Sequence, residues 1–154
     1  MSETLPPVLP DTLQRLLDGS QLEGKVGETL ELITVDPDGW PHVALLSVGE
    51  VLAVTPTELR LALWPSSQTT ANLHRTGRAT MTSIQEAGAY YARLEAAPLS
   101  TALGLATFRC HLLTLLVDRV DYADLTHGIR FALRDRAAAV ARWEDVIGGL
   151  RAAG

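Results

Sequence analysis

Hydrophobic and polar residues alternate with a period of two through the middle of the chain, the pattern of β-strands that bury one face. In residues 58–63, Leu59, Leu61 and Leu63 fall on one side, and the residues between them fall on the other. The same pattern predicts strands over residues 30–35, 41–48, 51–55, 78–84, 89–95 and 107–120. Short strands joined by tight turns, such as Asp36-Pro37-Asp38-Gly39, predict antiparallel pairing in a sandwich or barrel.

Two of these strands carry further information about their surroundings. Strict alternation along residues 107–120 predicts one face made of Phe108, Cys110, Leu112, Thr114 and Leu116. Residues 41–48 are instead apolar on both faces, at Val43, Leu45, Leu46 and Val48. One face of this strand fills the barrel. The other needs a cover, which a ligand, a helix or a second subunit would supply.

The chain begins with a different pattern. Residues 1–10 contain three prolines and are expected to form an extended arm. Asp11 and Gln14 have the spacing of a capping box, which predicts a helix beginning at Asp11. Leu13, Leu16 and Leu17 give this helix one apolar face, and Gly19 is expected to end it.

Two later segments also have helical periodicity. Residues 68–75 predict a short helix stopped by Gly77, and residues 134–151 predict a final helix. The final helix has an apolar stripe formed by Val140, Trp143, Ile147 and Leu150. The predicted fold class is therefore mainly β with N-terminal and C-terminal helices.

Composition narrows the function classes. The chain has 154 residues and is 47% hydrophobic, which suits one domain over residues 1–154, with a core at about 12–120. A net charge of -5 without a basic run argues against nucleic-acid binding, and no apolar run is long enough to cross a membrane. No signal peptide is visible, and a single cysteine suits a reducing cytoplasm, so a cytoplasmic protein is expected. The four histidines lack the close spacing of a zinc site, so no metal is expected.

The segment with the most chemical information is the loop that leads into the second helix. The predicted strand ends at Leu63 and Trp64, and a hydroxyl-rich run follows. Unsatisfied N–H groups and a positive dipole at a helix start favour an anion such as a phosphate. Plain N-capping by serine is the alternative, and it remains open on spacing alone. The hydroxyl groups of this run belong to Ser66, Ser67, Thr69 and Thr70.

Two pieces of the sequence resemble pyridoxamine 5'-phosphate oxidase-like proteins. The run from Leu32 to Val43 is similar to the family's opening hairpin, with an acidic turn and a Gly-x-Pro. The loop above, followed by Arg78-Ala79-Thr80-Met81, resembles the family's S-x-K-x-x-N-L segment and the strand after it. The resemblance covers about residues 12–120. It implies a six- to seven-stranded antiparallel split barrel of Greek-key type, which dimerises with FMN held between the subunits.

The resemblance also implies which residues hold the cofactor. Ser67 would bind the FMN phosphate, with the neighbouring hydroxyl groups in support, and Leu63 and Trp64 would border the pocket. The adjacent strand would lie beside the flavin ring and ribityl chain. The residues implied by position are His42, Val43, Leu45 and Ser47 on that strand, and Asn72 on the helix after the loop.

One position departs from the family pattern. The lysine of S-x-K is Thr69 in this chain, and Lys25, the only lysine, lies before the barrel. A neutral hydroxyl binds a phosphate less strongly than a charged amine does. The departure argues against pyridoxamine 5'-phosphate oxidase activity itself. Arg75, Arg78 or an arginine of a second subunit are the candidates to compensate.

The resemblance implies an FMN-dependent oxidoreductase that passes electrons from a reduced donor to a small organic acceptor. The cofactor would carry the redox chemistry, and no catalytic residue of the protein is assigned. Two alternatives remain open. One is a non-catalytic homodimer that binds flavin or haem or serves as a scaffold, and the other is a reductase that uses a deazaflavin coenzyme.

Overall fold

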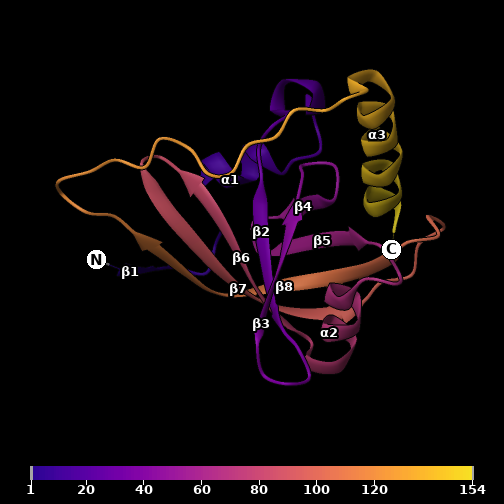
Figure 1. Ribbon diagram of the computed structural model, residues 1–154, viewed down its shortest axis with the longest axis horizontal. Helices are drawn as coiled ribbons and strands as arrows, with labels where there is room; N and C mark the ends of the chain where they lie inside the picture. Colours follow the sequence, from indigo (N-terminus) through magenta and orange to yellow (C-terminus); the bar gives the residue numbers. More distant parts are fainter. Residues whose placement is uncertain (1, 154) are drawn as a thin grey trace.

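The computed structural model describes residues 2–153, which form a curled antiparallel half-barrel with helices at its sides (Figure 1). Seven strands follow one another in the sheet in the order β3-β2-β6-β7-β8-β5-β4, and β1 pairs with β8 outside this path. The predicted mainly β class and split-barrel fold are therefore confirmed. The strands are β1 (Ser2–Leu5), β2 (Leu30–Val35), β3 (Pro41–Leu46), β4 (Val51–Thr55), β5 (Glu58–Leu63), β6 (Arg78–Gln85), β7 (Gly88–Pro98) and β8 (Ala106–Asp118).

The N-terminal arm is more ordered than the sequence predicts. Ser2–Leu5 form a strand, with Ser2 opposite Asp118 and Leu5 opposite Leu115. The first half of β8 pairs with β5 on the same edge, so β5 and β1 share that edge end to end. The arm therefore completes the sheet where β5 stops.

A β-bulge in β8 corrects the predicted alternation. Arg93 of β7 pairs with Thr114, whereas the next residue, Leu94, pairs with Leu112. The extra residue reverses which side chains face the core. The predicted face holds at Phe108, Cys110 and Leu112. Beyond the bulge it is wrong, because Leu115 and Val117 are buried in place of Thr114 and Leu116.

The helices are α1 (Asp11–Leu16), a 3₁₀ turn η1 (Leu22–Lys25), α2 (Gln68–Thr76) and α3 (Arg136–Ala152). The predicted capping box is wrong, because Asp11 already lies inside α1 and Pro10 occupies the N-cap position without a side-chain hydrogen bond. Gln14 Nε2 donates instead to the Leu9 carbonyl at 2.6 Å. The α1 helix also ends before Gly19. None of the helices within residues 2–153 is long and apolar enough to span a membrane.

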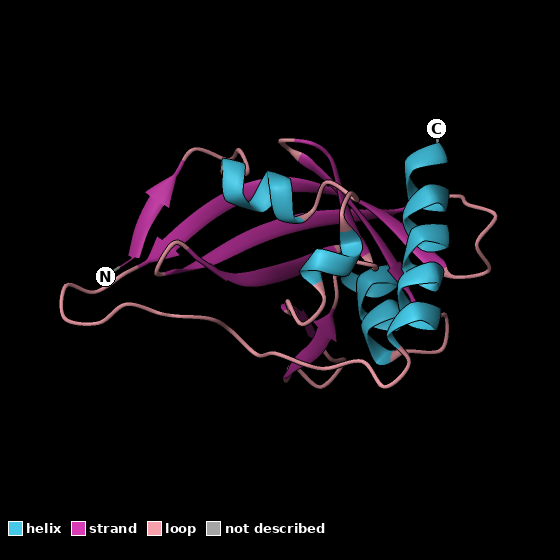
Figure 2. Cartoon of the chain, turned by 90° about the horizontal axis from the view of Figure 1, so that it is seen from above, coloured by secondary structure: helices cyan, strands magenta, loops and turns pink. Residues whose placement is uncertain are grey.

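Helix α3 packs against the sheet through the predicted stripe, since Val140, Trp143, Ile147 and Leu150 are all buried. Its C-terminal end is held by Arg60 of β5, which donates to the carbonyls of Leu150 at 2.7 Å and Ala153 at 2.6 Å. Residues 119–135 bring the chain back along the sheet to the start of α3 (Figure 2). The fold thus places a C-terminal helix beside strands from the first half of the chain.

Candidate functional site

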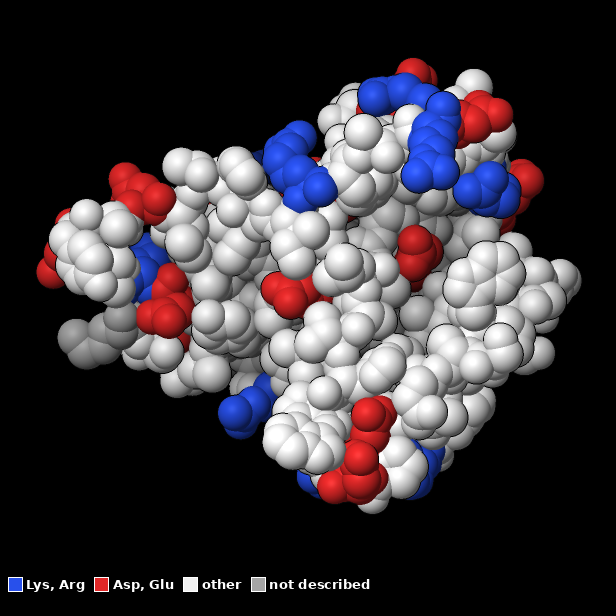
Figure 3. Space-filling view, viewed as in Figure 1, with Lys and Arg blue, Asp and Glu red and all other residues white. Residues whose placement is uncertain are grey.

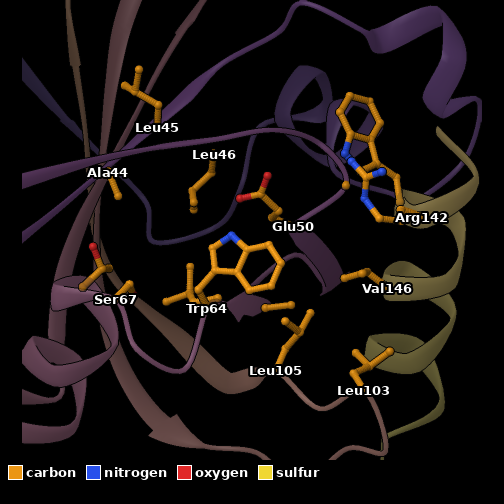
Figure 4. Close-up of a pocket in the computed structure, with 15 residues that line it drawn as sticks. Ala44, Leu45, Leu46, Glu50, Trp64, Ser67, Leu103, Leu105, Arg142 and Val146 are labelled. Atoms are coloured by element: carbon orange, nitrogen blue, oxygen red, sulfur yellow. The ribbon is translucent and has the colours of Figure 1, made fainter. Parts of the chain in front are cut away.

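A pocket opens where the path of the sheet ends. The strand order begins with β3 and ends with β4, and residues 47–50 connect these two edge strands directly. A cavity of about 490 Å³ lies between this turn, the start of α2 and helix α3 (Figure 4). This volume is within the usual range for small-molecule sites. Apolar side chains make most of the wall: Ala44, Leu45, Leu46, Ala62, Leu63, Leu103, Leu105 and Val146, with the indoles of Trp64 and Trp143.

The start of α2 forms one polar end of the pocket. Ser67 Oγ accepts a hydrogen bond from the Thr70 N–H at 3.1 Å and donates to Thr70 Oγ1 at 2.9 Å. Thr70 Oγ1 donates in turn to the Trp64 carbonyl at 2.7 Å. Ser67 is therefore the N-cap of α2, and it also lines the pocket with Thr69. The N–H groups of Gln68 and Thr69 lie in the first turn, where a helix offers them no acceptor of its own.

Five of the eleven residues expected at the cofactor line this pocket: Leu45, Leu63, Trp64, Ser67 and Thr69. Leu45 and Trp64 are exposed, at 55% and 74%, and lie toward the outside of the molecule. The buried Leu63 and Thr69 close the inner wall. Residues from two strands and one helix start thus meet around one cavity.

The other six lie outside the pocket lining. His42 Nδ1 is 3.7 Å from Asp36 Oδ1 on the β2–β3 hairpin. Val43 is half exposed on the same face of β3 as Leu45, and Ser66 is exposed beside Ser67. Thr70 closes the capping bonds described above, and Ser47 lies in the β3–β4 turn.

Asn72, the last of these six, is fully buried and connects α2 to β2. Its Nδ2 donates to Thr34 Oγ1 at 3.0 Å and to Asp36 Oδ1 at 2.9 Å. Its Oδ1 accepts from Gln68 at 2.9 Å and from Arg75 at 3.0 Å. These bonds fix the angle at which α2 meets the sheet. Asn72 therefore supports the site rather than facing the cavity.

Glu50 is a pocket residue that the sequence pattern leaves between the strands predicted over residues 41–48 and 51–55. Its carboxylate lies inside the cavity, between Leu46 and Trp64 in Figure 4. Ser47 Oγ donates to Glu50 Oε1 at 2.9 Å, and the Glu50 carbonyl accepts from the Ala62 N–H at 3.0 Å. Burial raises the pKa of the Glu50 carboxyl, and the hydrogen bonds from Ser47 offset this only in part. Glu50 is not among the predicted site residues, and the one sequence signal that could have identified it is a single charge within the apolar run of residues 43–54.

Basic residues are sparse around the cavity. Among residues 2–153, Arg142 of α3 is the one basic side chain that lines it, and Figure 4 places it at the opposite end from Ser67. Lys25 is engaged elsewhere, with Asp18 at 2.9 Å and the Arg15 carbonyl at 2.5 Å. Arg75 is bonded to Asn72 and to the Val35 carbonyl. The described residues hold no group of three or more metal-ligating side chains.

Comparison with known proteins gives one sequence relative and several structural ones. The uncharacterized protein YclD of Bacillus subtilis (strain 168) is 40% identical over 147 residues, which cover 93% of this chain and 96% of YclD. No protein-family model matches the chain.

Three solved structures share the fold at low identity. A proposed pyridoxamine 5'-phosphate oxidase from Lactobacillus delbrueckii is 15% identical, with a TM-score of 0.58 over 73% of this chain and 98% of its own. An F420 reductase is 13% identical, with a TM-score of 0.54 over 70% and 98%. An FMN-binding protein from Syntrophomonas wolfei is 14% identical, with a TM-score of 0.50 over 71% and 91%. The chain therefore belongs to the same family as YclD, and it has the split-barrel fold of the pyridoxamine 5'-phosphate oxidase-like proteins.

Proposed function

We propose that the pocket binds FMN and that the protein is an FMN-dependent oxidoreductase. The observation that carries the proposal is the pocket itself, which has apolar walls, two indoles and a helix N-terminus at one end. Flat aromatic ring systems pack well in such walls, and phosphates bind at helix N-termini. The bound flavin would supply hydride or electron transfer.

The residues present fit the two parts of FMN differently. Leu45, Leu63 and Trp64 would pack against the ring and keep water from it. Ser67, Thr69 and the free N–H groups of the first turn of α2 would hold the phosphate. No basic residue of the described chain lines this end of the pocket, so hydroxyl and backbone donors would do most of the phosphate binding. The expected affinity is accordingly modest.

We further propose that the protein is a homodimer with the cofactor between its subunits. The outward face of β3 and the turn before it expose large apolar side chains, including Trp40 at 71% in the turn and Val43 at 50% and Leu45 at 55% on the strand. Figure 3 shows that the surface on this side of the molecule is mostly uncharged, interrupted by a few Asp and Glu side chains. Contiguous exposed apolar surface of this kind is typical of an interface. A second copy would cover the face and complete the pocket.

Reduction of the bound flavin tests the oxidoreductase proposal. The protein is loaded with FMN and mixed anaerobically with NADH or NADPH, and the visible absorption of the flavin is followed. Bleaching, followed by recovery when an acceptor or oxygen is admitted, supports an oxidoreductase. Retention of oxidised FMN with both donors favours a non-catalytic flavin-binding dimer.

Because positive charge is sparse around Ser67, we also propose a deazaflavin coenzyme as a second candidate cofactor. The F420 reductase shares this fold, and a deazaflavin coenzyme would place a similar flat ring against the same walls. Parallel titrations with FMN and with the deazaflavin coenzyme distinguish the two. Tighter binding of the deazaflavin would assign the pocket to it.

A further inference from the structure

Glu50 is held in the pocket by hydrogen bonds from the neighbouring Ser47. Oε1 accepts a hydrogen bond from the Ser47 hydroxyl at 2.9 Å, and a backbone hydrogen bond from Ser47 also lowers the pKa of this carboxyl. The backbone on either side is fixed, because the Glu50 N–H donates to the Ser47 carbonyl at 3.2 Å and the Glu50 carbonyl accepts from Ala62. The side chain thus presents its carboxylate to a cavity whose walls are mostly apolar.

Little around the cavity compensates the charge of Glu50. Arg142 is the other charged residue of the lining. It lies on the exposed side of α3 and forms no ion pair with Glu50. The remaining surrounding elements contribute neutral residues: Gly49 from the turn, Leu63 from β5, Thr69 from α2 and Leu105 from the loop before β8, with the Ser47 hydroxyl bonded to the carboxylate from behind the lining. Without a ligand, water would reach the carboxylate from the cavity. A ligand that fills the cavity removes that water, which penalises the ionised carboxyl more than the neutral one.

We propose that Glu50 couples flavin binding in this pocket to the uptake of one proton, so that the ligand is held with the Glu50 carboxyl neutral. This inference rests on the proposed flavin site. The neutral carboxyl has an O–H donor, which suits the carbonyl and imine acceptors along the edge of an isoalloxazine ring. An ionised carboxylate would offer acceptors only, beside a ligand that already carries a negative phosphate.

The direction of the pH dependence follows from linkage. The pKa of the Glu50 carboxyl is already raised by burial in the empty protein, and filling the pocket raises it further. Binding is therefore tightest below the pKa of the empty state. It weakens as the pH rises from that value to the pKa of the filled state, by at most about tenfold in Kd per pH unit for one proton.

The test uses riboflavin as the probe, because the phosphate of FMN itself titrates near pH 6. Riboflavin Kd is measured by flavin fluorescence from about pH 5 to pH 8 for the wild type, Glu50→Gln and Glu144→Gln. Glu144 is exposed on α3 outside the pocket lining, so its substitution makes the same charge change away from the cavity. The wild type and Glu144→Gln should lose affinity with rising pH by several-fold or more, while Glu50→Gln should bind equally well throughout.

Two further measurements make the result independent of how Glu50→Gln folds. Calorimetric titration in buffers of different ionisation enthalpy should show about one proton taken up per riboflavin by the wild type at a pH between the two pKa values. Ser47→Ala removes a hydrogen bond that lowers the pKa of Glu50, so the loss of affinity should begin at a higher pH. Saturable riboflavin binding with no pH dependence, or with the same dependence in Glu50→Gln, overturns this inference and leaves the flavin site intact. No flavin binding at any pH overturns both.

Discussion

Two hydroxyl residues at the start of α2 lie close together and have different surroundings. Ser67 caps the helix through the Thr70 N–H and lines the pocket, whereas Ser66 is exposed beside it and lies outside the lining. Ser67→Ala should weaken FMN binding by about tenfold to a hundredfold, since a hydrogen bond to a charged group contributes about 1.5–3 kcal/mol, and leave riboflavin binding unchanged. It should also cost about 1 kcal/mol of stability through the lost cap.

Ser66→Ala is the matched control, and both variants are titrated with FMN and with riboflavin. If Ser67→Ala binds FMN as tightly as Ser66→Ala does, the phosphate assignment at the start of α2 is wrong.

Cys110 is a reactive group governed mainly by its burial. It lies in the core between β7 and β5, and burial, assisted by the negative charge of Glu58, raises its pKa to about 12. Its thiol should resist a thiol reagent at pH 8 in the native protein and react at once after unfolding. Since the folded pKa is raised, stability should be unaffected by this group below about pH 9 and fall between there and pH 12. Cys110→Ser should lack this alkaline loss in denaturant melts, and fast reaction of the native thiol would contradict the burial.

The residues of the site differ in how far the sequence points to them. Ser67 and Thr69 were predictable, because a hydroxyl-rich loop before a helix has local meaning. Glu50 had only a weak signal, a lone charge in an apolar run. Arg142 had none, since an exposed arginine between the apolar positions of a helix is ordinary, and only the packing of α3 brings it to the pocket.

At the scale of elements, the contact between the β3–β4 turn and α3 shapes the cavity. A Cβ on Gly49 would lie 2.0 Å from Cγ of Trp143, so the turn can approach the helix only with glycine at this position. Gly49→Ala should push α3 outward and destabilise the protein by about 1–3 kcal/mol. It should also weaken flavin binding, because α3 forms one wall.

Gly148→Ala is the control for this substitution. Gly148 lies within α3 with open space around it, and alanine there should stabilise the helix by roughly 0.5–1 kcal/mol. Thermal or denaturant melts compare the two variants. Equal stability for both would show that α3 does not depend on the close approach at Gly49.

Element boundaries were predictable wherever the local pattern was unambiguous. The ranges of β2, β4 and β5 agree with the alternation, and α2 ends at Gly77 as its sequence indicates. The bulge in β8 was not predictable, because it depends on how β7 pairs with β8 and leaves no local signal. The pairing of β1 is likewise a long-range event, since Ser2 lies opposite Asp118.

At the scale of the whole molecule, the outward face of β3 is the surface through which we propose that two chains associate. Val43→Glu places a charge on this face and outside the pocket lining. If a second copy covers the face, the variant should sediment as a monomer at concentrations where the wild type is dimeric, because an unpaired charge in an apolar interface is costly. Flavin binding should weaken with it.

Leu113→Glu is the control, since Leu113 is 44% exposed in the bulge of β8. It should retain the wild-type sedimentation. A wild-type chain that is monomeric at all concentrations would contradict the proposed dimer, and a Val43→Glu variant that stays dimeric would place the interface elsewhere.

The most direct test of the central claim is a titration of the purified wild-type chain with FMN, followed by flavin fluorescence. The pocket at the β3–β4 turn predicts saturable binding at about one FMN per chain. It also predicts that the fluorescence of the flavin is quenched on binding, because the ring packs against Trp64. Absence of binding at roughly tens of micromolar FMN would contradict the account and leave a split barrel whose pocket serves another ligand.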